Sequence, residues 1–342
     1  MSLFVRLMAG LLGTVGLIVA AGSASAECGG SDQAAADGIA SRIDRVAPEI
    51  ADITRAPIKR GAEHITAAGE KLSISIPKNN SGKVVLGRPD SEKGSHFDVG
   101  LPSDGDVKDA VIARDGTVTY PNSLKATDLA VQSFQDSVRV VMVIRGDEAP
   151  SEFVYPVDVP AGGSMKIGQD GGVLVMNPDG LLRGGFAAPW AKDNLGREVA
   201  THYEIRRNTV VQVVAHHGAA YPIIADPWMG KELIKSAAWI KREPGFTLQV
   251  TPTAWARKQR GSHDAGEAGW DELYSKYKNE GRGIKKNKQG MRDQYICHQE
   301  FVTIRDPGKA TWNLDEYRPH VGYFRTVVAS CNPGVGERPE PD

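Results

Sequence analysis

The stretch LSISI at residues 72–76 decides the fold class, because its apolar and polar residues alternate strictly. A period of two places neighbouring side chains on opposite faces, which is the pattern of a strand with one buried face. Turn sequences such as RDG at 114–116 and NPDG at 177–180 separate further runs of this kind, and no helical period lies between them. The expected strands cover 84–86, 110–113, 117–120, 129–133, 138–144, 153–159, 164–167, 173–176, 200–205, 209–215 and 221–225. The chain is therefore predicted to be mainly β to α+β, with a β-sandwich-like segment that carries short helices.

On the N-terminal side of these strands the apolar period lengthens to that of a helix. Ile39, Ile43, Val46, Ile50 and Ile53 recur at spacings of three and four. A proline at position 48 interrupts the pattern, so two short helices or a kink are expected. We therefore predict a helical segment over residues 27–71, which either packs on its own domain or serves oligomerisation, and a β-rich domain over 72–227.

The first 26 residues have the pattern of a secretory signal peptide. Arg6 precedes an apolar run at 7–21, and ASA at 24–26 provides a small-x-small cleavage site. Glu27 stands before Cys28 where a lipoprotein signal would have a small residue. No later apolar run approaches the ~20 residues of a membrane span. We expect cleavage after residue 26, no transmembrane segment in the mature protein, and a secreted location, extracellular or associated with the cell wall.

The composition changes after Pro227. Residues 228–342 contain 19 basic and 15 acidic side chains, although the whole chain has a net charge of −1 and therefore no general attraction for nucleic acid. Strands are expected at 233–239, 246–251, 295–304 and 321–330, with a helix on which Trp270, Leu273, Tyr274 and Tyr277 share one face. These features predict a small α+β domain over 228–334 that buries its own core, with few contacts across Pro227, and a disordered tail over 335–342.

Two resemblances support this division. The phrase YPIIADP at 221–227 resembles the end of a β-rich segment in secreted actinobacterial proteins. Beyond it, GMRDQYICH at 290–298, KATWNLDEYRP at 309–319 and CNP at 331–333 resemble an uncharacterised two-cysteine C-terminal domain of such proteins. The resemblance implies a domain and an exported location, and it implies no reaction.

Cys297 and Cys331 are the expected disulfide, because an exported chain meets an oxidising environment and both residues fall in or beside predicted strands. Cys28 is then a free thiol or an intermolecular bridge. Catalysis by Cys297 with the adjacent His298 is disfavoured, since neighbours in a strand face opposite ways.

The candidate acid–base or metal-type residues are His298, Glu300 and His320, with Asp315 and Arg318 close in sequence. In a strand, His298 and Glu300 would share a face, and the disulfide would draw His320 towards them. The competing interpretation is a solvated structural face, because no compact metal motif is present, and no metal or cofactor is expected. The doublet His216 and His217 is expected to face opposite ways in a strand and to be structural.

A basic run supplies candidate anion-binding residues, namely Lys285, Lys286, Lys288 and Arg292. They would meet an anionic cell-envelope polymer, or they form a solvated loop. The function expected from the sequence is non-catalytic binding or interaction outside the cell, with such a polymer or a protein as partner. The alternative is a secreted effector whose C-terminal domain is a hydrolase or nuclease-type toxin.

Overall fold

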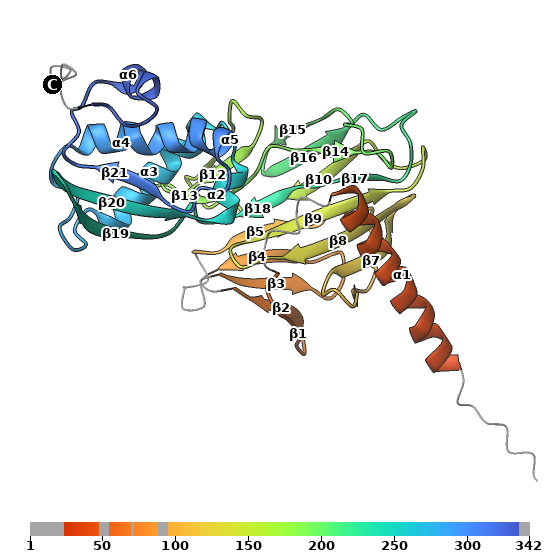
Figure 1. Ribbon diagram of the computed structural model, residues 1–342. Helices are drawn as coiled ribbons and strands as arrows, with labels where there is room; N and C mark the ends of the chain where they lie inside the picture. Colours follow the sequence, from red (N-terminus) through yellow and green to blue (C-terminus); the bar gives the residue numbers. More distant parts are fainter. Residues whose placement is uncertain (1–23, 48–54, 70–71, 88–94, 335–342) are drawn as a thin grey trace, which may run out of the picture.

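The computed structural model describes residues 24–47, 55–69, 72–87 and 95–334. It confirms a mainly β fold, with several antiparallel sheets, short helices and a disulfide in the C-terminal part. Figure 1 shows a large strand-rich body beside a smaller lobe in which helices lie over a sheet. Among the described residues, no helix combines the length and the apolar character that a membrane crossing requires.

The body contains three antiparallel sheets. The five-stranded sheet consists of β1 (Ile58–Arg60), β2 (His64–Ala68), β3 (Ser73–Pro77), β4 (Lys83–Gly87) and β5 (Phe97–Gly100). The three-stranded sheet consists of β10 (Glu152–Pro156), β15 (Thr201–Arg206) and β16 (Thr209–Val214). The ten-stranded sheet consists of β6 (Val111–Ile112), β7 (Val118–Leu124), β8 (Thr127–Ser133), β9 (Ser137–Ile144), β11 (Ser164–Ile167), β12 (Val173–Met176), β13 (Leu182–Phe186), β14 (Ala191–Lys192), β17 (Ile223–Ala225) and β18 (Trp228–Gly230).

Strand β9 shows how the body is layered, because it is buried on both faces. Val140 and its even-numbered neighbours face a core that all three sheets share. Val141 and Val143 face the other way, onto the helix α1 (Ala24–Val46), where they meet Ile39 and Ile43. The helical stripe expected from the sequence is therefore confirmed for Ile39, Ile43 and Val46.

The expectation of helix throughout 27–71 is wrong in its second half. Strands β1 and β2 lie there, and Ile65 and Ala67 alternate into the shared core with the period of a strand. Pro48, Ile50 and Ile53 lie outside the described residues, as do the tail at 335–342 and the first 23 residues of the expected signal peptide.

The C-terminal lobe is built on a separate sheet. Its strands are β19 (Ile234–Arg242), β20 (Gly245–Pro252) and β21 (Trp312–Asp315), and its helical elements are α2 (Ala254–Lys258), α3 (His263–Tyr277), α4 (Lys288–Cys297), the π-helical turn η3 (His298–Val302), α5 (Thr303–Arg305) and α6 (Tyr323–Val328). Helix α3 buries Trp270 and Leu273, as the sequence predicted, against Leu248 and Trp312 of the sheet.

Two of the expected C-terminal strands are helical instead. Residues 295–304 continue α4 through η3 into α5, and residues 321–330 contain α6. Met291 and Tyr295 lie one helical turn apart and both enter the core on the sheet, so the apolar period here is that of a helix. In α6, Phe324 and Val328 face solvent and Thr326 is buried, whereas in a strand these three residues would share one face.

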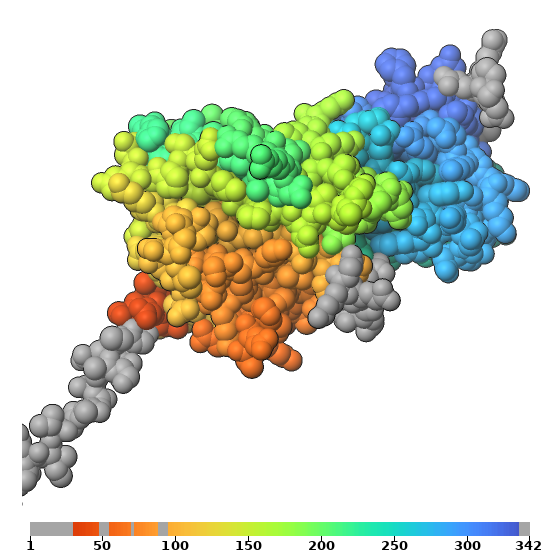
Figure 2. All heavy atoms as spheres, turned by 180° about the vertical axis from the view of Figure 1, so that it is seen from behind, coloured from red at the N-terminus to blue at the C-terminus, as the bar shows by residue number. Residues whose placement is uncertain are grey.

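The expected boundary after Pro227 is also misplaced. Strand β18 begins at Trp228 and pairs with β9, so residues from both sides of Pro227 share one sheet. The Pro227 carbonyl accepts a hydrogen bond from the Val140 amide at 3.0 Å, and the pairing with β9 continues beyond the proline. The core around Trp255 of α2 also includes Phe134 and Leu174 of the body. Contacts across the expected boundary are therefore extensive, and Figure 2 shows the C-terminal lobe lying directly against the body.

Candidate functional site

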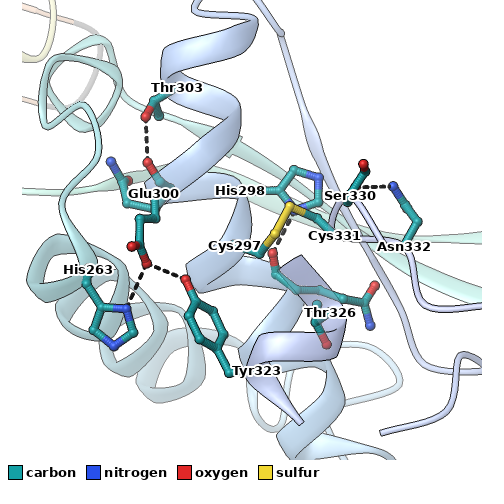
Figure 3. Close-up of a disulfide and its surroundings, with 12 residues drawn as sticks. His263, Cys297, His298, Glu300, Thr303, Tyr323, Thr326, Ser330, Cys331 and Asn332 are labelled. Carbon is teal, nitrogen blue, oxygen red and sulfur yellow. Dashed lines mark hydrogen bonds and ion pairs between the residues drawn. A yellow bond between two sulfur atoms is a disulfide. The ribbon is translucent and has the colours of Figure 1, made fainter. Parts of the chain in front are cut away.

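The disulfide between Cys297 and Cys331 is confirmed, with their Cα atoms 5.5 Å apart. Both residues are fully buried and pack with Val302. Figure 3 shows the bond between the helix that ends at Cys297 and the segment after α6, so it joins a helix end to a turn and not the strands that the sequence suggested.

His298 is a buried structural residue. Its Nδ1 donates a hydrogen bond to the Gln294 carbonyl oxygen at 2.7 Å, and its ring stacks on Trp312 with centroids 6.1 Å apart. Burial lowers the pKa of His298 to about 4, so the imidazole is neutral at pH 7. A buried neutral ring with one nitrogen committed to a backbone carbonyl supports packing of the lobe.

Glu300 lies on the opposite side of the helix from His298 (Figure 3). The predicted shared face is wrong because residues two apart in a helix are separated by roughly 200° around the axis. The Glu300 carboxylate accepts from His263 Nδ1 at 2.8 Å and from the Tyr323 hydroxyl. It thereby ties α3, η3 and α6 together, with both of these partners on one oxygen.

The remaining predicted residues are Asp315, Arg318 and His320. Asp315 is buried and accepts from Thr247 Oγ1 and Arg318 Nε, each at 2.5 Å. The Arg318 guanidinium also donates to the Pro333 carbonyl at 2.9 Å, which holds the end of the described chain. His320 Nε2 lies 3.2 Å from Asp293 Oδ2. The structure therefore pairs Asp315 with Arg318 and gives His298, Glu300 and His320 separate contacts.

A cavity of about 460 Å³ lies where the body meets the C-terminal lobe, and we call it the junction cavity. Its lining residues are Arg139, Ala187, Ala188, Trp190, Lys192, Asp226, Trp228, Lys258 and Arg260. Four of these side chains are cationic and one is a carboxylate, so the cavity is electropositive. Pockets at domain junctions with a few convergent polar groups are common ligand sites.

The floor of the junction cavity is a buried ion pair. Arg139 of β9 is fully buried, and its Nε lies 3.5 Å from Asp226 Oδ2. The Trp190 amide donates to Asp226 Oδ1 at 3.4 Å. Burial raises the pKa of Asp226 to about 6, against the opposing effect of Arg139. This carboxylate therefore changes charge in a pH range where the surrounding lysines and arginines stay cationic.

Two tryptophans form the walls. The Arg139 guanidinium lies 4.6 Å from the Trp190 ring centroid, and Lys258 Nζ lies 5.0 Å from the Trp228 ring centroid. Trp228 is held in turn by stacking on Phe134, with centroids 5.0 Å apart. Indole faces hold cations in place, and fixed cations beside flat apolar walls suit a ligand with an anionic group and a ring.

The C-terminal lobe matches a known family model. Residues 234–334 match the family model described as "Protein of unknown function (DUF2599)". Uncharacterized proteins Mb0487 of Mycobacterium bovis and Rv0477 of Mycobacterium tuberculosis are each 30% identical to the chain over 125 residues, which is 36% of this chain and 80% of theirs. The chain belongs to the family of these mycobacterial proteins. Uncharacterized protein ML2452 of Mycobacterium leprae is 36% identical over 47 residues, 14% of this chain and 38% of that protein.

The DUF2599 domain supplies one side of the junction cavity, because Lys258 and Arg260 fall within its matched range. Arg139, Trp190 and Trp228 come from the body. Sequence reasoning missed this site, since its residues are far apart in the chain. One signal was available, namely an arginine in the otherwise apolar run VRVVMVI at 138–144, where an unpaired charge would be costly.

The basic run on the DUF2599 domain is partly engaged within the protein. Arg292 Nη2 lies 2.7 Å from Glu267 Oε1, and Lys288 Nζ lies 3.8 Å from the Tyr274 ring centroid. Lys285 and Lys286 are exposed. Of the four predicted anion-binding residues, these two remain directed to solvent without an ion pair to any described residue.

Proposed function

We propose that the protein is exported and binds an anionic polymer of the cell envelope at the junction cavity, without catalysing a reaction. The observation that carries the proposal is the convergence of Lys192, Lys258 and Arg260 around two tryptophans in one cavity, beside the buried Arg139. A phosphodiester or carboxylate of the polymer would pair with the accessible cations, and a sugar ring would lie against the half-buried indole of Trp190.

Export is supported by the sequence pattern of residues 1–26, and the disulfide is in keeping with an oxidising compartment. Intact mass measurement on the protein recovered outside the cytoplasm tests this part. A chain that begins at Glu27 is expected, and retention of Met1 in a membrane fraction would contradict export in soluble form.

The binding test compares two basic surfaces of the same chain. The exported protein is titrated with a soluble polyphosphodiester and with polygalacturonate, and neutral dextran serves as the control polymer. Tryptophan fluorescence and calorimetry measure the affinity at two salt concentrations. Lys258→Ala combined with Arg260→Ala should weaken binding at least tenfold, because both cations line the cavity.

The matched control is Lys285→Ala combined with Lys286→Ala, which removes the same charge from the basic run. It should change the affinity less than threefold. A larger loss in the control than in the cavity variant would move the anion site to the basic run, and an absence of binding to both charged polymers would reject anion binding.

The alternative function is that of a secreted effector with a catalytic C-terminal domain. Its one specific support is the His263, Glu300 and Tyr323 cluster, in which a carboxylate, an imidazole and a phenol are in contact. Expression of the full mature chain in a bacterial cytoplasm and in the periplasm separates the two functions. Growth arrest that Glu300→Gln relieves would favour the effector.

A further inference from the structure

The loop that follows β16 brings His216 and His217 together. A hydrogen bond from the His216 amide to the Val214 carbonyl at 3.0 Å bends the chain out of the strand, so the two rings no longer alternate. Their centroids lie 4.4 Å apart. The expectation that they face opposite ways is therefore wrong, because the two imidazole rings lie next to each other.

A carboxylate from a different loop meets this doublet. Asp147, in the loop after β9, places Oδ1 2.7 Å from His217 Nδ1. The Tyr221 hydroxyl lies 3.2 Å from the same oxygen and 2.9 Å from His216 Nδ1. One ligand atom each from Asp147, His216 and His217 fall within 4.8 Å of one another. Ligand atoms of a tetrahedral zinc ion lie about 3.3 Å apart, so small side-chain movements would admit an ion.

We propose that Asp147, His216 and His217 form a binding site for a divalent transition metal, and that Zn²⁺ fits their ligand set. Two imidazole nitrogens and one carboxylate oxygen suit Zn²⁺ and disfavour Mg²⁺ or Ca²⁺, which prefer oxygen ligands alone. Asp147 and His217 are exposed, so water can complete the coordination. The Tyr221 hydroxyl is the alternative fourth ligand.

The protonation states suit a cation. His216 is buried, which favours the neutral form of its imidazole. The Asp147 carboxylate accepts hydrogen bonds from His217 and Tyr221, which favour its charged form. Metal binding would replace the contact between His217 Nδ1 and Asp147 Oδ1. Because ligands bind a metal in their deprotonated forms, the affinity should fall in acid. None of its three residues lines the junction cavity, and this site does not depend on the proposed polymer binding.

The test uses the mature chain without an affinity tag. Co²⁺ titration follows the visible absorption of a tetrahedral ion, Zn²⁺ competes for the same site, and calorimetry gives the stoichiometry. One equivalent is expected, and zinc should raise the melting temperature. His217→Ala and Asp147→Asn should each weaken binding at least tenfold. Asp147→Asn is nearly isosteric and keeps an oxygen that accepts from His217 and Tyr221, so the fold should be retained.

Two control variants locate the site. His202→Ala removes an exposed histidine that lies 3.5 Å from Glu204 without a second imidazole, and binding should be unchanged. His263→Ala removes the histidine between Glu300 and Glu267 and should also leave binding unchanged. No saturable binding, binding that survives both His217→Ala and Asp147→Asn, or binding lost only in a control variant would overturn the proposal.

Discussion

Replacing Gly230 with alanine tests how tightly the DUF2599 domain is joined to the body. A Cβ atom at Gly230 would lie 2.3 Å from two ring atoms of Trp255 and 2.7 Å from a third. Trp255 is fully buried, and Gly230 is fixed by pairing with Ser137 of β9 and Gly185 of β13. Neither the Trp255 ring nor the paired backbone at Gly230 can move freely, and overpacking of this kind costs about 1–3 kcal/mol.

Urea unfolding followed by far-ultraviolet circular dichroism and by tryptophan fluorescence measures the change. Gly230→Ala should lower the free energy of unfolding by about 1–3 kcal/mol. Trp255→Ala alone should cost about 3–5 kcal/mol, because it removes a large side chain from a closed core. In the Trp255→Ala background the Gly230→Ala change should cost little, since the clashing ring is gone.

Gly38→Ala is the matched control. Gly38 lies in α1 with no atom within 4 Å of its added Cβ. The change should stabilise the protein by about 0.5–1 kcal/mol through helix propensity. The reasoning is refuted if Gly230→Ala stays within 0.5 kcal/mol of the parent chain, or if its cost persists when Trp255 is absent, with the control behaving as stated.

Three further outcomes are expected. Burial raises the pKa of Asp226 from 3.8 to about 6, so the stability that its proton contributes is present below about pH 4 and lost as the pH rises through about 6. Phosphodiester affinity should fall over the same pH rise. Asp226→Asn should flatten both profiles, which pH titrations of unfolding and of binding would check. Replacing Cys297 and Cys331 together with serine should lower the free energy of unfolding by about 4 kcal/mol for a separation of 34 residues, by urea titration. Gly269→Ala should cost about 1–3 kcal/mol by the same measurement, because its Cβ would lie 2.3 Å from the hydroxyl oxygen of buried Tyr295; an unchanged midpoint would contradict the close approach of α3 and α4.

The body was largely predictable because its strands follow one local rule. Residues 138–144 and 209–215 were expected to be strands and form β9 and β16. The helices of the C-terminal lobe were harder to predict, because buried glutamines interrupt their apolar stripe. Gln294 exchanges hydrogen bonds with the Asp315 backbone, and Gln299 donates to the Ala256 and Gln259 carbonyls. Gln299 lies within 295–304, where its polarity interrupts the apolar period of a helix.

The disulfide was predictable from the expected export and the cysteine count, but the candidate sites were not. Arg139 and Lys258 are brought together only by the packing of β18 and α2, and local sequence contains no record of that packing. The prediction for His216 and His217 failed for a related reason. A single bend after β16 reverses which face His217 occupies, and its partner Asp147 lies 70 residues away.

The position of the junction cavity limits what the mycobacterial relatives can share with this chain. Mb0487 and Rv0477 each have only a fifth of their length outside the 125 matched residues, which is too short to hold both the body and the DUF2599 domain. The cavity needs Arg139 and Trp228 from the body as well as Lys258 from the domain. Anion binding at the cavity would therefore belong to chains with both parts. A property common to all DUF2599 domains would have to reside within residues 234–334, where the Glu300 cluster and the disulfide lie.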